Sequence, residues 1–165
     1  MQLNPGVERA FEMKPSPGIG ALETPSDLLA KLRHDFKRMR VDPFDAYSAF
    51  DFFVTAEHLA DWILPGRAND SQRRTLKEAP LLSVISHIAN GAKHFFVEDK
   101  RHTSVRHVDS VDGAFDPGIF DPGVFDTGGL VVTLEGPAAV TLGTRVSALS
   151  LAEQTIAFWE QKLGK

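Results

Sequence analysis

Apolar residues recur at the spacing of an α-helix after residue 24. The stripe consists of five side chains: Leu28, Leu29, Leu32, Phe36 and Met39. Such a stripe is typical of a helix that places one face on a core. Thr24 offers a hydroxyl for an N-cap, and Pro25 fits the first helical position, where a backbone N–H has no partner. The first helix is therefore predicted to begin at Thr24.

A second helix is predicted to begin with Asp42 as its cap and Pro43 as its first residue, and to end at Pro65-Gly66. Its apolar residues occupy more than one side, and the large ones are Phe44, Phe50, Phe52, Phe53 and Trp62. A helix that is apolar on several sides needs several neighbours. We therefore expect this helix to be central and to supply a surface for a homodimer or for another protein partner.

Residues 66–74 are interpreted as a loop, and a third helix is predicted to open near Pro80 and to continue to residue 96. Its apolar stripe consists of Leu81, Ile85, Ile88, Ala92 and Phe95. A final helix is predicted in residues 149–165, with Ser150 as its cap, Glu153 completing a capping box and Gly164 ending it.

After residue 95 the pattern changes to alternation and β-branched residues. Short strands are predicted at residues 95–98, 104–109, 130–135 and 139–146, with a turn at residues 135–137 between the last two. The expected fold class is α+β, with a layer of three to four helices packed on a small, mostly antiparallel sheet. Residues 1–23 are expected to form an arm, and residues 24–165 a single domain: helices to residue 96, strands with a turn-rich loop at 112–129, then the last helix.

The predicted loop contains a repeat of period five, FDPGIFDPGVFDTGG. Each repeat opens with a phenylalanine: Phe115, Phe120 and Phe125. Asp-Pro-Gly is turn chemistry, so we interpret the repeat as serial turns held by aromatic anchors. The alternative is a calcium site with three carboxylates as ligands: Asp116, Asp121 and Asp126. Calcium loops place their carboxylates closer together in sequence, which favours chain routing.

The composition is that of a globular protein, with 42% apolar and 24% charged residues among 165. The net charge of −4 disfavours a general nucleic-acid coat protein. The absence of cysteine excludes disulfides, thiolate catalysis and iron–sulfur clusters. We see no secretory signal and no run of apolar residues long enough for a membrane span, so a cytoplasmic location is expected.

The best local cluster of catalytic residue types is His58 with Asp61, which share one face of the second helix. His87 and His94 lie on one side of the third helix, but seven residues separate them by about 10 Å. One ion cannot bind both, so a metal site would need His58, Asp61 and one of these histidines. The alternative is that the histidines form hydrogen bonds between helices. We favour that alternative and predict no metal and no cofactor.

The polar face of the first helix is strongly basic. It carries Lys31, Arg33, Lys37, Arg38 and Arg40. These side chains suit an RNA or a phosphate, or they form a solvated face. With a negative net charge, the solvated face is the preferred interpretation and a nucleic-acid partner is disfavoured.

The segments AYSAFDFFVTAEHLADWI and LLSVISHIANGAKHFF resemble the two long helices of small uncharacterised bacterial and phage-associated proteins. This arrangement, over residues 24–96, is similar to the HEPN superfamily of helical bundles, which includes toxin and antiphage ribonucleases. The family signature is an arginine followed four to six residues later by a histidine on a helix. The matching pair here is Arg101 and His107, which we expect on a strand.

The predicted function is therefore a non-catalytic binding or interaction module. The alternative is an enzyme, either a HEPN-like ribonuclease or a metal-dependent hydrolase with its site between the second and third helices. The candidate residues for these activities are His58, Asp61, His87, His94, Arg101 and His107.

Overall fold

The computed structural model describes residues 19–93, 103–115, 119 and 127–165. The helices are α1 (Pro25–Val41), α2 (Ala46–Ile63), the 3₁₀ turn η1 (Arg67–Asn69), α3 (Asp70–Lys77), α4 (Pro80–Lys93), α5 (Gly136–Leu142) and α6 (Ala148–Leu163). The strands are β1 (Val105–Asp112), β2 (Gly128–Leu134) and β3 (Arg145–Ser147), in one antiparallel sheet of order β1-β2-β3. The predicted α+β class is confirmed.

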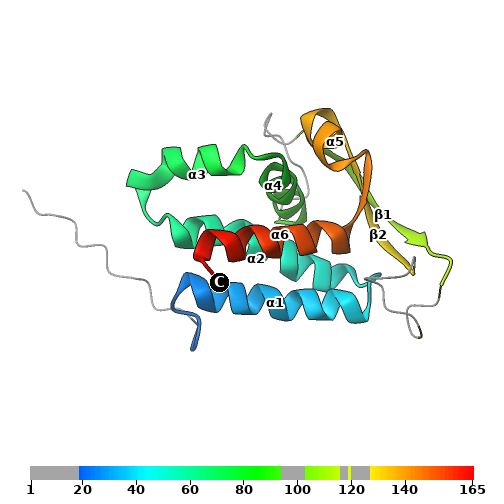
Figure 1. Cartoon of the computed structure of the whole chain (residues 1–165), viewed down its shortest axis with the longest axis horizontal. Helices are drawn as coiled ribbons and strands as arrows, with labels where there is room; N and C mark the ends of the chain where they lie inside the picture. The colour runs from blue at the N-terminus through cyan, green and yellow to red at the C-terminus, as the bar shows by residue number, and fades with distance from the viewer. Residues whose placement is uncertain (1–18, 94–102, 116–118, 120–126) are drawn as a thin grey trace, which may run out of the picture.

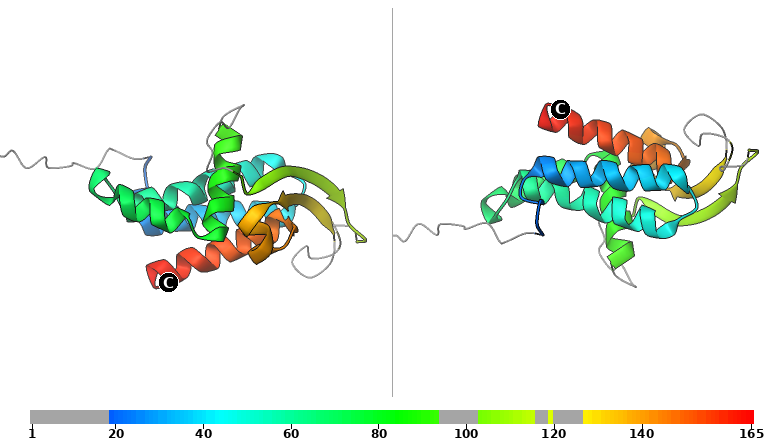
Figure 2. Two further views of the ribbon diagram at one scale, coloured as in Figure 1. Left: turned by 90° about the horizontal axis from the view of Figure 1, so that it is seen from above. Right: turned by 90° about the horizontal axis from the view of Figure 1, so that it is seen from below.

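Helices α1, α2 and α6 lie alongside one another, α4 runs across them, and the sheet lies at one end of the helical layer (Figures 1 and 2). The core fills the space between these elements. Its largest fully buried apolar side chains are Trp159, Phe52, Leu29, Leu32, Leu59, Ile85, Leu151, Val84 and Val132. The sheet thus contributes to the same core as the helices, through β2.

The predicted start of α1 is confirmed. Thr24 Oγ1 accepts from the Asp27 backbone N–H at 3.2 Å, and the Asp27 carboxylate accepts from the Thr24 N–H at 2.8 Å. This reciprocal pair is a capping box, with Pro25 in the first turn. The predicted stripe faces the core, and four of its members, Leu28, Leu29, Leu32 and Met39, are buried.

The prediction for the start of α2 is wrong. The helix begins at Ala46, and its cap is Asp45, whose carboxylate accepts from the N–H groups of Tyr47 and Ser48. Asp42 instead follows α1, and its carboxylate accepts from the Phe44 N–H at 3.0 Å in a turn.

The apolar sides of α2 have neighbours within the chain. The helix contacts α1, α3, α4 and α6, and Phe52 and Phe53 are buried. The large aromatic side chains that stay at the surface are Tyr47, 82% exposed, and Phe50, 43% exposed. The chain itself therefore covers much of α2, Tyr47 and Phe50 remain at the surface, and a homodimer stays a prediction.

The interpretation of residues 66–74 as a loop is wrong, because they contain η1 and the start of α3. Helix α3 has no buried residue, so no apolar stripe marks it in the sequence. Arg73 holds it in place, since its guanidinium pairs with Asp70 and donates to the Leu64 and Gly66 carbonyls that follow α2. This contact satisfies backbone acceptors at a helix end.

The predicted strand at residues 139–146 is also wrong, because residues 136–142 form α5 and strand pairing is limited to β3. Pro137 lies in the first turn of α5, and Gly143 ends the helix with a φ of 94°. This is the usual distribution of proline and glycine at helix ends, which outweighs the β-branched content. The cap of α6 is Ser147, one turn earlier than the predicted Ser150, while the end at Gly164 is confirmed.

The predicted strands at 104–109 and 130–135 correspond to β1 and β2. The strand predicted at 95–98, most of the N-terminal arm and most of the five-residue repeat with its three aspartates lie outside the described residues. Of the anchors predicted in the repeat, Phe115 is described and is 42% exposed. Among the helices that the structure describes, none has the length and apolar character needed to cross a membrane.

Candidate functional sites

His58 and Asp61 lie in a charged cluster where α2 meets α3 and α4. The Nδ1 atom of His58 is 3.7 Å from Asp61 Oδ2. Asp61 Oδ1 also lies 3.3 Å from Arg73 Nε and 3.9 Å from Lys77 Nζ. On the other side of the ring, Lys93 Nζ is 3.3 Å from His58 Nε2. Asp61 therefore lies close to several cationic side chains. The Lys93 ammonium lies beside His58 Nε2, the nitrogen that a substrate or metal would contact.

The environment of His58 favours the neutral imidazole. Partial burial lowers the pKa of His58 most, and the nearby Lys93 ammonium lowers that pKa further. Asp61 and Glu57 act in the opposite direction but do not outweigh these two effects. A neutral ring whose Nε2 faces an ammonium group acts as a hydrogen-bond acceptor, which agrees with the interpretation of His58 as a link between α2 and α4.

Glu57 makes the shortest contacts of the two acids in this cluster. One of its carboxylate oxygens is 2.6 Å from Lys77 Nζ in α3, and the other accepts from Ser86 Oγ in α4 at 2.5 Å. The Glu57 side chain is 11% exposed, so both bonds form largely away from water. Sequence analysis overlooked this residue, because nothing local shows that Ser86 and Lys77 lie beside it.

His87 points to the sheet and not to α2. Its Nδ1 accepts from the Val105 backbone N–H at 2.9 Å and lies 3.3 Å from Ser104 Oγ. The Nδ1 atom of His87 is thus engaged by the backbone at the start of β1. His87 therefore ties α4 to the start of β1, and it does not converge with His58.

The ribonuclease-like pair is described in part. Arg101 lies outside the described residues, and so does His94 of the metal-site hypothesis. His107 lies in β1, as predicted, with Nε2 at 2.8 Å from Asp109 Oδ2 and 3.3 Å from Thr133 Oγ1. Over the described ranges, no three histidine and acidic side chains come close enough together to hold a metal ion.

The basic face of α1 is largely engaged in ion pairs. Arg33 binds Glu160 of α6 at 2.7 Å, and Arg38 binds Asp51 of α2 at 2.6 Å. Lys31 binds Asp35, which is 1% exposed. Arg33 and Arg38 of this face therefore attach α1 to α6 and α2. The sequence analysis considered a solvated face and an RNA or phosphate site, and did not consider this role.

Strand β1 offers a surface of a different kind. It pairs with β2, and in the sheet as described it has no strand on its other side. Residues 106–110 are all exposed, including Val108 at 43%. A bulge at Arg106 interrupts the pairing with β2, so the regular part of the strand starts at His107. An exposed edge strand presents a row of backbone donors and acceptors that suit another strand.

No protein-family model, curated protein or solved structure matched this chain. Its function has to be inferred from the chemistry of its own surfaces. The candidate histidines that the structure describes, His58, His87 and His107, have partners within the chain. The edge of β1 is a surface with backbone groups directed outward.

Proposed function

We propose that this protein is a non-catalytic interaction module that forms a homodimer by pairing β1 with β1 of a second copy. The observation that carries the proposal is the open edge of β1, exposed over five consecutive residues. Antiparallel pairing of the two edges would join the two sheets into one. Backbone direction and side-chain order along β1 both support this arrangement.

The direction of the backbone groups follows from β2. The Leu130 N–H donates to the Pro43 carbonyl at 3.0 Å, and the Leu134 N–H donates to the Thr144 carbonyl at 2.9 Å. Both acceptors lie away from β1. The N–H and carbonyl groups of successive residues alternate in direction along a strand. Val131 and Thr133 therefore direct these groups toward β1.

The pairing register between β1 and β2 gives the direction of each backbone group in β1. Val131 pairs with Asp109, and Thr133 pairs with His107, so these residues of β1 use their backbone groups on β2. Val108 lies between them and directs its N–H and carbonyl toward the open edge. Backbone groups in this orientation are what a second strand requires.

Three antiparallel registers use these outward groups and keep the strands symmetric, and they are centred on Val108, Asp109 or Ser110. Centring on Asp109 places this carboxylate opposite its own copy, which is an unfavourable pair. Centring on Ser110 places Val108 opposite Asp112, which is an unfavourable pair. Centring on Val108 places the two valines opposite each other and His107 opposite Asp109 twice. Apolar cross-strand pairs contribute roughly 0.2–1 kcal/mol each, and carboxylates opposite each other are destabilising, so the side chains favour the register centred on Val108.

Substitution of Val108 tests this assignment. In Val108→Lys two ammonium groups would face each other at the centre of the paired edges, so we expect a monomer at concentrations where the natural protein is dimeric. The matched control is Val140→Lys, because Val140 is 89% exposed and belongs to α5 and not to the sheet. Sedimentation equilibrium measures the association of each protein.

A charge exchange tests the register itself. His107→Asp would place acids opposite Asp109 in both copies and weaken the dimer, and the double variant H107D/D109H would restore it by exchanging the two partners. A natural protein that stays monomeric at every concentration would overturn the proposal. So would a dimer that Val108→Lys leaves intact.

A further inference from the structure

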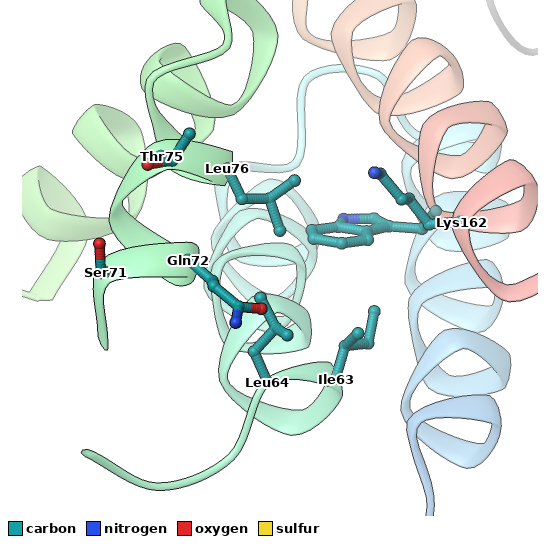
Figure 3. A pocket seen from close by; sticks show the side chains of 8 residues that line it. Ile63, Leu64, Ser71, Gln72, Thr75, Leu76 and Lys162 are labelled. Carbon is teal, nitrogen blue, oxygen red and sulfur yellow. The ribbon is translucent and has the colours of Figure 1, made fainter. Parts of the chain in front are cut away.

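The groove between the end of α2, α3 and the last turns of α6 offers little chemistry that would select a ligand. In Figure 3 Leu76 and Lys162 approach it from α3 and α6, with Ile63 of α2 below them. Trp159 contributes to the wall, but the residue is 1% exposed and its indole Nε1 is buried. The polar residues that line the groove are exposed ones: Ser71, Gln72, Thr75 and Lys162. The edge of β1 carries more specific chemistry.

His107 and Asp109 form an ionisable pair beside this open edge. The Nε2 atom of His107 is 2.8 Å from Asp109 Oδ2. Side chains two residues apart point to the same face of a strand, so the pair lies on one face of the sheet. The two side chains are 48% and 57% exposed. A second strand added at the edge of β1 would therefore lie beside both of them.

The proposed dimer brings two copies of this pair together. In the register centred on Val108, on which this inference rests, His107 of each copy lies opposite Asp109 of the other. The outward backbone groups of Val108 make the two valines a hydrogen-bonded pair, so the pairs on either side are non-hydrogen-bonded and their side chains lie closer together. His107 and Asp109 of the two copies therefore form one cluster in which imidazoles and carboxylates alternate.

The charge of this cluster depends on the imidazoles. Histidine changes its charge between about pH 5 and pH 8, while aspartate is ionised throughout this range. With neutral imidazoles the cluster holds two carboxylates as diagonal neighbours across the strands, roughly 7–8 Å apart, and their charges repel each other. In the single chain, the carboxylate partner of His107 is Asp109 of its own copy. In the dimer each protonated ring would gain the carboxylate of the other copy as well.

The other strands keep their charges while histidine titrates. Thr133 of β2 pairs with His107 and has its Oγ1 3.3 Å from Nε2. Arg145 of β3 is in register with Thr133 and stays positive throughout this pH range. Glu135 of β2 lies 3.6 Å from Arg106 Nε, and both stay ionised. A change in the charge of the cluster therefore comes from the imidazoles.

We infer that protonation of His107 tightens the β1 dimer, so that this interface responds to pH. Each imidazolium adds one opposite-charge pair across the strands, and the symmetric dimer contains two such pairs. Together they predict a dissociation constant roughly twofold to thirtyfold lower at about pH 5.5 than at about pH 8. Salt screens exposed charges, so the difference should decrease in about 1 M sodium chloride.

Sedimentation equilibrium of the whole chain at these two pH values measures the difference, and circular dichroism confirms that the protein is folded at both. His107→Gln keeps a polar side chain but removes the titrating group, so its dimer should have the same dissociation constant at both pH values. The matched control is His34→Gln on α1, an exposed histidine whose loss should leave the difference unchanged. The His107 variant also separates this effect from His87 of α4, whose Nδ1 accepts from the Val105 N–H at 2.9 Å.

Asp109→Asn tests the partner of the imidazole. Without the carboxylates, protonation would leave two positive rings in the cluster and no negative charge between them. Acidification should therefore weaken the dimer of this variant, which is the opposite of the change expected for the natural protein.

The outcomes separate this inference from the pairing of β1. A dimer with equal dissociation constants at both pH values would refute the inference and leave the pairing intact. So would a pH dependence that persists in His107→Gln. A protein that is monomeric at both pH values, or a dimer that Val108→Lys leaves intact, would instead remove the pairing itself and with it the response to pH.

Discussion

Replacing Asp35 with alanine tests how strongly a buried carboxylate holds α1 against α2. Asp35 is 1% exposed, and its Oδ2 accepts from the Lys31 ammonium and from Thr55 Oγ1 at 3.3 Å. Lys31 also donates to Thr55 at 2.9 Å, so the three groups form one network between the two helices. The other carboxylate oxygen lies 3.7 Å from Arg38 Nη1.

The magnitude follows from what each partner does after the carboxylate is removed. Breaking a buried ion pair by deleting one member costs about 3–5 kcal/mol when the remaining charge stays buried. Here the Lys31 side chain is 34% exposed and can be hydrated, and Thr55 keeps Lys31 as a partner. We therefore expect the lower limit for Asp35→Ala, about 3 kcal/mol of unfolding free energy. For a chain of this size this corresponds to a decrease in Tm of roughly 6–12 °C.

Urea unfolding followed by circular dichroism measures the effect. The matched control is Asp51→Ala, which removes an aspartate bound to the same Arg38 at 2.6 Å but 41% exposed at its side chain. We expect a small change for this control, because surface ion pairs contribute little. If Asp35→Ala proved no more destabilising than Asp51→Ala, the role given to burial here would be refuted.

Two further predictions concern His58 and Gly129. Burial, and next Lys93, hold the pKa of His58 below the ordinary value of 6.5, so the unfolded chain binds its proton at a higher pH than the folded chain. The stability that neutral His58 contributes is therefore complete above pH 6.5 and is lost as the pH falls toward the folded pKa. His58→Gln should remove this part of the decrease in the urea midpoint between about pH 7.5 and about pH 5.5. An unchanged decrease in the variant would contradict the assignment. Gly129 has a φ of 128°, and a Cβ there would lie 2.7 Å from Pro43 Cβ. Gly129→Ala should cost more than about 1 kcal/mol in thermal unfolding, and it should cost more than Gly136→Ala, which also has a positive φ but meets no atom within 4 Å.

Elements with local signals were predictable from the sequence. The cap of α1, its apolar stripe and the alternation along β1 and β2 depend on neighbours in the sequence, and the structure agrees with each. Helix α3 was missed because its stability comes from Arg73, which binds carbonyls near the end of α2. Helix α5 was missed because β-branched residues were given more weight than Pro137 and Gly143.

The candidate sites were predictable only within one helix. The spacing of His58 and Asp61 placed them side by side, but their cationic neighbours come from α3 and α4. The directions of the α4 side chains depend on how that helix is rotated, so the sequence did not show that Ser86 meets α2 while His87 meets β1. The sequence analysis also did not identify Asp35 as buried, although its spacing from Leu32 and Met39 places it on the apolar stripe of α1.

Amide hydrogen exchange of β1 tests the proposed edge pairing most directly. The Asp109 N–H is directed at β2 within the chain, whereas the Val108 and Ser110 N–H groups are directed at the open edge. We predict that protection of Val108 and Ser110 rises with protein concentration as the dimer forms, while protection of Asp109 stays constant. Fast exchange of Val108 and Ser110 at every concentration, or in a dimer detected by sedimentation, would contradict the account.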